Sequence, residues 1–300
     1  MKDRCSKLSN NSLLCVGDME TNMVIVDHTA IDASLPPVHI QVKPRLLLIT
    51  HGHADHFRYA HEYKSMGLLV AAPRHCIPLI ENPAINQMAT IGWAGPIDEK
   101  LVTRYFIGKG VRVDTPLEPG RINDSIEAIA APGHTPGHLV YLVETSDPRI
   151  LVAGDTVLGH DYLEKNPLPY HTSTIWLEGS LNKIKSLNAD ILVPGHGEPA
   201  TGKRELLKLV DRNFSKIQES LSLVEKNLPR PDEQPIYTDE VVARIAETLG
   251  FSHSKRAYSA LSPTVRALLL ALKHMGRAET ITRRGVLAWR RAQNKKHRPH

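Results

Sequence analysis

Three histidines and one aspartate lie within six consecutive positions of the chain: His51, His53, Asp55 and His56. The apolar run RLLLIT (45–50) directly precedes them and has the composition of a short buried strand. His51 and His53 are two residues apart, so in extended backbone their side chains point to the same side. Imidazole nitrogens and carboxylate oxygens suit zinc, iron or manganese. The stretch therefore predicts a metal site at a strand end.

The same arrangement recurs at three further points, where a metal-ligating residue follows an apolar run and a Gly or Pro. His134 follows the run 125–131, Asp155 follows 149–154, and His196 follows 190–194. If these strand ends share one edge of the sheets, all the ligands converge there. The recurrence disfavours the alternative of a histidine-rich surface loop that arose by chance.

Seven ligands exceed the number that one tetrahedral ion takes, and they suit two ions. We expect one ion to be held by His51, His53 and His134, the other by Asp55, His56 and His196, with Asp155 bridging. Two ions roughly 3.5–4 Å apart can share a hydroxide whose pKa falls toward about 7. The chain has no G-x-S-x-G, P-loop or G-x-G-x-x-G motif. The pattern therefore predicts hydrolysis by a metal-bound hydroxide, with Asp55 also a catalytic residue.

Four motifs, in this order and spacing, resemble the metallo-β-lactamase superfamily: THGHADH (50–56), PGHTPGH (132–138), AGDT (153–156) and PGHG (194–197). The resemblance covers residues 10–200 and implies an αββα sandwich with a dinuclear site at one edge. The segment MVIVDHTA (23–30) is similar to the family's first motif, which makes Asp27 the expected supporting residue beside the ligands. His28 departs from that motif.

The complete H-x-H-x-D-H signature resembles glyoxalase II and other general hydrolases more than β-lactamases proper. The segment 179–197, the long helix after it and the C-terminal part resemble the β-lactamase-like-2 branch, some of whose members are single-strand endoribonucleases. The resemblance thus implies two substrate classes, which the motifs do not separate.

The rest of the chain predicts a mixed α/β catalytic domain over 1–228, a proline-rich linker over 229–235 and a basic, mainly helical domain over 236–300. A continuous apolar face predicts a helix over 205–228. Helices are expected at 237–249 and 253–261, and a third begins at Ser262 and Pro263 and ends at Gly276. A hairpin that turns at 283–285 completes the order of a winged helix-turn-helix.

Four further features are expected to contact the ligands or the substrate. His138 begins a strand and is expected to support the ligands rather than bind metal. His160, Tyr170 and His171 lie in a proline-rich segment that either lines the pocket or is an ordinary exposed loop. Residues 81–100, which include Trp93, form either a lid or a plain surface insertion.

Charge is unevenly distributed along the chain. Residues 251–300 hold twelve Lys or Arg and one acidic residue, whereas residues 1–250 hold 25 basic and 31 acidic residues. The basic part either binds nucleic acid, with Arg283 and Arg284 at the wing tip, or docks on the catalytic body or on a second subunit of a homodimer.

The hydropathy and the cysteines of the chain indicate where in the cell the protein is expected to lie. No segment approaches the roughly 18 apolar residues of a membrane span, and the N-terminus lacks the apolar core of a secretory signal. Cys5, Cys15 and Cys76 share no metal-ligand spacing, so we expect free thiols, with Cys15 and Cys76 in the core, and a cytoplasmic protein without a membrane partner.

The predicted function is that of a hydrolase with two divalent ions, zinc or else iron or manganese, acting on a small ester, thioester or lactone. The first alternative is a metal-dependent endoribonuclease whose basic domain binds single-stranded RNA. The second is a non-catalytic nucleic-acid-binding protein with a structural metal centre. Seven ligands spread over four loops disfavour the second, because structural sites are usually closed by four.

Overall fold

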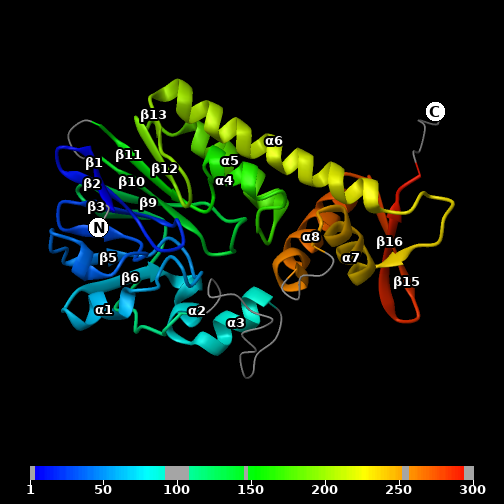
Figure 1. Cartoon of the computed structure of the whole chain (residues 1–300), viewed down its shortest axis with the longest axis horizontal. Coiled ribbons are helices and arrows are strands. Elements are labelled where there is room, and N and C mark those ends of the chain that lie inside the picture. Colours follow the sequence, from blue (N-terminus) through cyan, green and yellow to red (C-terminus); the bar gives the residue numbers. More distant parts are fainter. Residues whose placement is uncertain (1–3, 92–107, 145–147, 252–256, 294–300) are drawn as a thin grey trace.

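The computed structural model describes residues 4–91, 108–144, 148–251 and 257–293 (Figure 1), so the predicted role of Trp93 lies outside the described residues. The first sheet has seven strands in sequence order. They are β1 (Cys5–Ser9), β2 (Ser12–Val16), β3 (Asn22–Val26), β4 (Thr29–Ile31), β5 (Leu46–Leu48), β6 (Leu69–Pro73) and β7 (Thr115–Leu117). The strands β4 to β7 run parallel, which sends the ends of β4 and β5 to one edge of the sheet.

The second sheet has six strands in the order β13-β12-β11-β10-β9-β8. They are β8 (Gly120–Asn123), β9 (Ile126–Ala130), β10 (Leu139–Val143), β11 (Ile150–Gly154), β12 (Ile191–Pro194) and β13 (Ala200–Thr201). The central pair β11 and β12 is parallel, with Ile150 opposite Ile191. Asp155 and His196 therefore leave the sheet at the same edge.

The two sheets pack face to face, with helices on both outer faces (Figure 1). Leu48 of the first sheet and Tyr141 and Val152 of the second belong to the core between them. The strands β3, β10 and β11 are buried at every position, which explains their mainly apolar sequences, in which Asn22 of β3 is the polar exception. The predicted two-sheet α/β arrangement is confirmed.

The helices form two groups, one on the side of each sheet (Figure 1). The first group comprises η1 (Pro37–His39), α1 (Ala60–Ser65), η2 (Arg74–Cys76), α2 (Ile77–Glu81) and α3 (Pro83–Ile91). The second comprises α4 (His160–Lys165), α5 (Thr174–Ser186) and α6 (Lys203–Asn227). The predicted apolar face of α6 is slightly rotated, because Leu206 and Leu209 are buried whereas Leu207 is half-buried.

The C-terminal part contains two described helices and a small sheet. The elements are β14 (Ile236–Tyr237), α7 (Thr238–Thr248), α8 (Ala257–His274), β15 (Ala278–Arg283) and β16 (Val286–Arg291), with strand order β14-β16-β15. The predicted helix end at Gly276 is confirmed by its φ of 70°. The predicted hairpin turn is also confirmed, with Arg284 and Gly285 both at positive φ.

The predicted helix start at Ser262 is wrong, because α8 runs through Pro263 without a break. A proline inside a helix removes one hydrogen bond. Leu261 and Val265, on either side of it, are buried in the core, and this packing outweighs the local preference.

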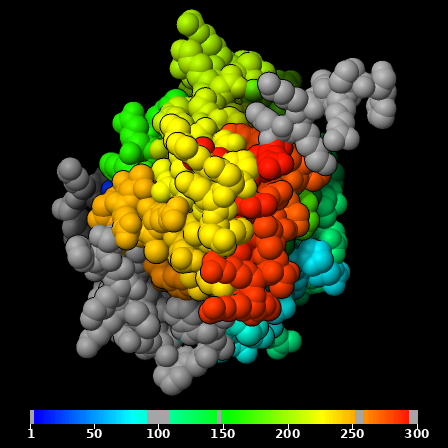
Figure 2. Space-filling model, turned by 90° about the vertical axis from the view of Figure 1, so that its right-hand side faces the viewer, coloured from blue at the N-terminus to red at the C-terminus, as the bar shows by residue number. Residues whose placement is uncertain are grey.

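The buried side chains of α8 belong to the same hydrophobic core as those of α5 and α6. Figure 2 shows the outer face of this end, where the yellow segment after α6 runs between α7 and the orange-red hairpin. The domain boundaries at 228 and 236 therefore remain a prediction, since one continuous core crosses both.

The prediction of free thiols is wrong for Cys5 and Cys15, which face each other across β1 and β2 and form a disulfide. Cys76 is free and buried, as predicted. The cysteines therefore no longer favour the cytoplasmic location that we expected. Among the described helices, none is long and apolar enough to cross a membrane.

Candidate metal centre

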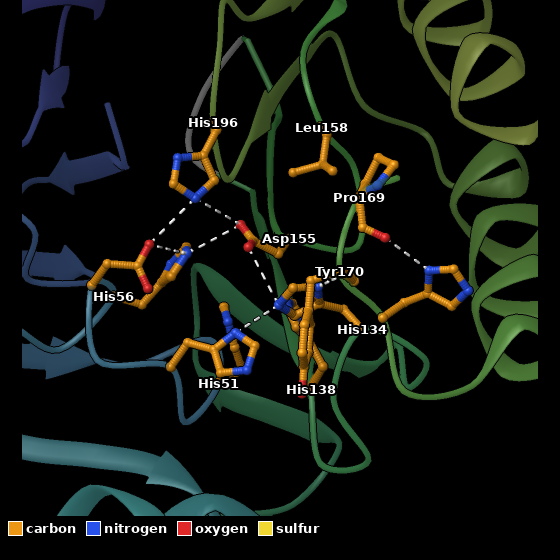
Figure 3. Close-up of polar contacts among 12 residues, drawn as sticks. His51, His56, His134, His138, Asp155, Leu158, Pro169, Tyr170 and His196 are labelled. Carbon is orange, nitrogen blue, oxygen red and sulfur yellow. Dashed lines mark hydrogen bonds and ion pairs between the residues drawn. The ribbon is translucent and has the colours of Figure 1, made fainter. Parts of the chain in front are cut away.

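The structure brings the seven predicted ligands together at one edge of the sandwich (Figure 3). They form two groups, in each of which one ligand atom per residue lies within 4.8 Å of the others. The first group is His51, His53, His134 and Asp155, and the second is Asp55, His56 and His196. All seven side chains are buried. Loops that are far apart in sequence thus build one compact centre.

Asp155 lies between the two groups. Its Oδ2 is 3.3 Å from Nε2 of His134 in the first group, and its Oδ1 is 3.1 Å from Nε2 of His56 in the second. A carboxylate with one oxygen toward each group is in the position required to bridge two ions. The backbone after β12 approaches it so closely that a Cβ on Gly195 would lie 1.9 Å from Oδ1 of Asp155.

The donor atoms fit divalent cations. Nε2 of His51 and Nε2 of His56 are buried and make no hydrogen bond within the described part of the chain, although each points into the cluster. Buried polar atoms in native proteins nearly always have a partner. Nε2 of His51 without such a bond, and Nε2 of His56 with the carboxylates of Asp155 and Asp55 beside it, are the arrangement expected of ligands.

The residue that orients His56 is Asp32, not the predicted Asp27. Oδ2 of Asp32 accepts a hydrogen bond from Nδ1 of His56 at 2.7 Å, which leaves Nε2 to face the cluster. Asp32 is buried, and Thr50 donates to it from both its backbone N–H and its hydroxyl. Asp27 is exposed in the turn before β4. Asp32 directly follows the strand β4, the same pattern that identified the ligands.

Thr21 was not predicted, and it contacts the second group. Its hydroxyl donates to Oδ2 of Asp55 at 2.9 Å, and its backbone pairs with His196. The next residue, Asn22, donates to the carbonyls of Pro194 and Gly197 on either side of that histidine. The turn between β2 and β3 therefore holds two ligands in place. Only its GDMETN turn composition marked it in the sequence.

His134 is oriented by a backbone carbonyl. Its Nδ1 donates to the carbonyl oxygen of Tyr170 at 2.9 Å, so Nε2 faces the cluster. The ring of Tyr170 contacts the ring of His53 edge-on, with centroids 5.0 Å apart. Tyr170 therefore lies beside the ligands, as predicted.

His171 points away from the cluster instead of lining it. Its Nδ1 donates to the carbonyl of Pro169 and its Nε2 accepts from the Thr174 hydroxyl at the start of α5. Its backbone N–H donates to the hydroxyl of Thr264 on α8, at 3.1 Å. His171 therefore does not contact the ligands, and its backbone anchors this segment to α8, while the predicted contact with substrate remains a prediction. His160 is exposed at the start of α4.

His138 lies behind the first group. Its ring stacks on that of His51 with centroids 4.7 Å apart, and its Nδ1 is 3.3 Å from the Thr156 hydroxyl. The ring is buried next to His51 and is not part of either ligand group. This position agrees with support of a ligand rather than metal binding.

The histidines of the cluster differ in the direction in which their pKa values are shifted. Burial lowers the pKa of His53 to about 3 and that of His134 to about 4, so both rings are neutral and offer a lone pair. Burial also disfavours the charged form of His56, but the carboxylates of Asp155, Asp55 and Asp32 outweigh it and raise the pKa of this ring. The carboxyl of Asp155 keeps a lowered pKa despite its burial, because His196 and His56 lie beside it and favour its ionised form.

Residues 41–196 match the family model of the metallo-beta-lactamase superfamily. A protein named probable metallo-hydrolase YflN, from Bacillus subtilis (strain 168), is 27% identical over 190 residues, which are 56% of this chain and 71% of that protein. The hydroxyacylglutathione hydrolase GloC of Haemophilus influenzae is 26% identical over 161 residues, 52% of this chain and 70% of that enzyme.

Two solved structures share the fold over nearly the whole chain. A beta-lactamase domain protein from Burkholderia ambifaria superposes with a TM-score of 0.65 at 16% identity and covers 96% of this chain and 93% of its own. A metallo-beta-lactamase family protein from Thermus thermophilus superposes with a TM-score of 0.63 at 17% identity and covers 93% of each chain. The likeness in fold thus extends beyond the matched family segment into the C-terminal elements.

Proposed function

The chain belongs to the metallo-β-lactamase superfamily and is a hydrolase of that fold, and on this premise we propose that it uses two divalent ions to cleave an ester, thioester or lactone. The observation that carries the proposal is the pair of ligand groups joined by Asp155. We expect the ions to be zinc, with iron or manganese as alternatives, because the ligands are imidazoles and carboxylates.

The ligand groups would hold one ion each, the first through His51, His53 and His134, the second through Asp55, His56 and His196, with Asp155 shared. Two such ions supply an activated water at neutral pH and polarise the substrate oxygen. The protein itself fixes the ligand geometry. Asp32, Thr21 and the carbonyl of Tyr170 each hold one ligand in a single orientation. Asp55 keeps one oxygen on Thr21, which limits how its carboxylate can turn.

A carbonyl substrate is favoured over RNA by the charges of the C-terminal part. Three of its arginines lie in ion pairs: Arg266 with Asp239, Arg277 with Glu225, and Arg290 with Glu279. These pairs involve three of the twelve basic residues that the sequence places there and reduce the charge available to a nucleic acid. The hydrolase name of the GloC relative points in the same direction, since hydroxyacylglutathione is a thioester.

The C-terminal elements follow the order α6-β14-α7-α8-β15-β16, which we interpret as a winged helix with α8 in the place of the recognition helix. A recognition helix must present one face to the groove of the nucleic acid. Val265, Leu268 and Leu272 of α8 are instead buried in the core shared with the catalytic part. We therefore propose that this module braces the site rather than reads nucleic acid.

The test has two parts, metal content and a substrate panel. Purified protein should bind two equivalents of zinc or manganese and hydrolyse p-nitrophenyl esters, S-lactoylglutathione or a lactone. His53→Ala should lose at least one ion and most of the turnover. His39→Ala is the matched control, because His39 is exposed on η1, away from both ligand groups. Turnover of every substrate by His53→Ala at the wild-type rate would reject the proposal.

The RNA alternative is tested on the full-length chain. Removing residues 236–300 is unsuitable because it would expose the core that α8 shares with α5 and α6. The double variant Arg283→Glu and Arg284→Glu instead inverts two charges at the exposed hairpin tip. Cleavage of single-stranded RNA by the wild type, lost in this variant while ester hydrolysis persists, would favour the endoribonuclease.

A further inference from the structure

A small cavity of about 20 Å³ lies between the metal centre and the helices that cover the second sheet. Its walls are Leu163 of α4, Leu177 and Leu181 of α5, and Ile217 of α6. Figure 3 shows Leu158, which also lines it, beside Asp155 at the end nearest the ligands. The cavity therefore connects the interior of the helical layer with the bridging carboxylate.

The polar side chains that line this cavity already have partners within the protein. Asn213 bonds to the backbone N–H and carbonyl of Leu158. Ser220 donates to the carbonyl of Lys216, whose ammonium lies 3.6 Å from Glu219. These groups offer nothing further to a polar ligand. The surface that remains is aliphatic, so the matching occupant is aliphatic too.

Asp155 and Tyr170 are the two lining residues that also contact the ligand cluster. An aliphatic chain in the cavity would thus have its polar end at the metal centre. That is the geometry required of an acyl group whose carbonyl is to be attacked, with the tail buried and the carbonyl beside the ligands.

We propose that this cavity is the acyl-chain subsite of the enzyme and selects short, unbranched aliphatic acyl groups. The inference rests on the proposed carbonyl hydrolysis. A water-sized group needs roughly 10–15 Å³, so the cavity of about 20 Å³ holds about one or two methyl-sized groups. Because the carbonyl carbon stays at the metal centre, an acyl group of about two or three carbons fits without displacing Leu181 or Ile217, which are buried at its walls.

The chain-length profile follows from the cavity volume. Each methylene that leaves water for an apolar pocket strengthens binding by about fourfold. The value of kcat/KM should rise from the acetyl to the propionyl substrate and then fall for hexanoyl and octanoyl, which exceed the free space. A series of acyl thioesters or p-nitrophenyl esters measures this directly.

Ile217→Ala should enlarge the cavity and move the optimum to longer chains. The hexanoyl-to-propionyl ratio of kcat/KM should rise by about tenfold or more, which is the effect of burying two more methylenes. Leu221→Ala is the matched control, because Leu221 is buried one turn further along α6 and does not line the cavity. It should lose similar stability and keep the wild-type profile. An unchanged profile in Ile217→Ala would overturn the proposal.

A second variant works in the opposite direction and covers the case in which Ile217→Ala does not fold. Ser220→Val places two methyl groups at the wall and should abolish the advantage of propionyl over acetyl substrates. Calorimetric titration of the metal-loaded protein with acetate, propionate and hexanoate gives a readout without turnover. Affinity should increase to propionate in the wild type and to hexanoate in Ile217→Ala.

The two proposals fail in different ways. Turnover of esters or thioesters with no dependence on chain length, and carboxylate binding that ignores Ile217→Ala, would overturn the subsite and leave the hydrolase intact. Absence of any ester, thioester or lactone turnover by protein loaded with two ions would overturn the proposed function. Binding of propionate that is unchanged in Ser220→Val would overturn the subsite independently of activity.

Discussion

Asp32→Asn isolates the contribution of a single buried carboxylate to metal binding. The carboxylate accepts from the backbone N–H of Thr50 at 2.8 Å through one oxygen and from Nδ1 of His56 at 2.7 Å through the other. Asparagine can satisfy only one of these donors, because its amide nitrogen must face the other. With the oxygen toward Thr50, His56 has to carry its proton on Nε2, the nitrogen that faces the cluster.

The magnitude follows from the bond that is lost. A hydrogen bond to a charged group contributes about 1.5–3 kcal/mol. Loss of a residue that orients a ligand typically weakens metal binding by about 10–100-fold, which is about 1.4–2.8 kcal/mol. The two ranges agree. We therefore expect the group with Asp55, His56 and His196 to lose about 10–100-fold in affinity, and the other group to change less.

Competition with a chromophoric chelator, followed by elemental analysis, measures both affinities. Asp27→Asn is a close control, because Asp27 also has positive φ, 48° against 64° for Asp32, but is exposed. Asparagine tolerates this backbone conformation at both positions. Circular dichroism should show both variants folded. Two ions bound by Asp32→Asn with affinities within about twofold of wild type would refute the reasoning, because a lost orienting residue costs more than that.

Three further predictions concern the surroundings of the site. Thr264→Val leaves the buried backbone N–H of His171 without an acceptor, so the free energy of unfolding should fall by about 1–3 kcal/mol. Zinc affinity should fall by up to about tenfold, because the same segment orients His134 through the carbonyl of Tyr170. Chelator competition measures this affinity, and a value equal to that of the wild type would contradict the link to His134. Burial lowers the pKa of His171 to about 4, so below pH 6.5 the unfolded chain binds a proton that the folded one does not, and stability falls by up to about 3 kcal/mol between pH 6.5 and 4. His171→Asn should flatten that part of a denaturation profile, and an unchanged slope would reject the assignment. Cys5→Ser should lower the free energy of unfolding by about 2–3 kcal/mol in the absence of reductant. Dithiothreitol should then no longer change the stability of the variant. A variant whose stability still falls in dithiothreitol would contradict the bond with Cys15.

The ligand set could be predicted because each ligand follows a strand end, and strand ends are visible as apolar runs. The residues around the ligands were harder. Asp27 and Asp32 lie five residues apart on either side of the three-residue strand β4, which is too short to leave a clear pattern. Only the observed register shows which carboxylate turns inward.

Contacts between distant parts of the chain were not predictable from the sequence. The bond from His171 to Thr264 spans 93 residues and has no motif. The continuation of α8 through Pro263 depends on burial against α5 and α6, which local propensity does not record. The disulfide of Cys5 was missed because β1 is half-exposed and does not read as a strand.

The anchor at Thr264 also affects the order in which the protein can be completed during synthesis. All seven ligands have been translated by residue 196, yet the hydrogen bond from His171 to Thr264 cannot form until α8 is made and packed. A nascent chain that ends within α6 therefore carries every metal-binding side chain but lacks this bond and leaves an apolar face uncovered. Exposed apolar surface in such intermediates promotes aggregation. Burial of the last helix thus covers this apolar face and adds the final hydrogen bond to the segment that orients His134.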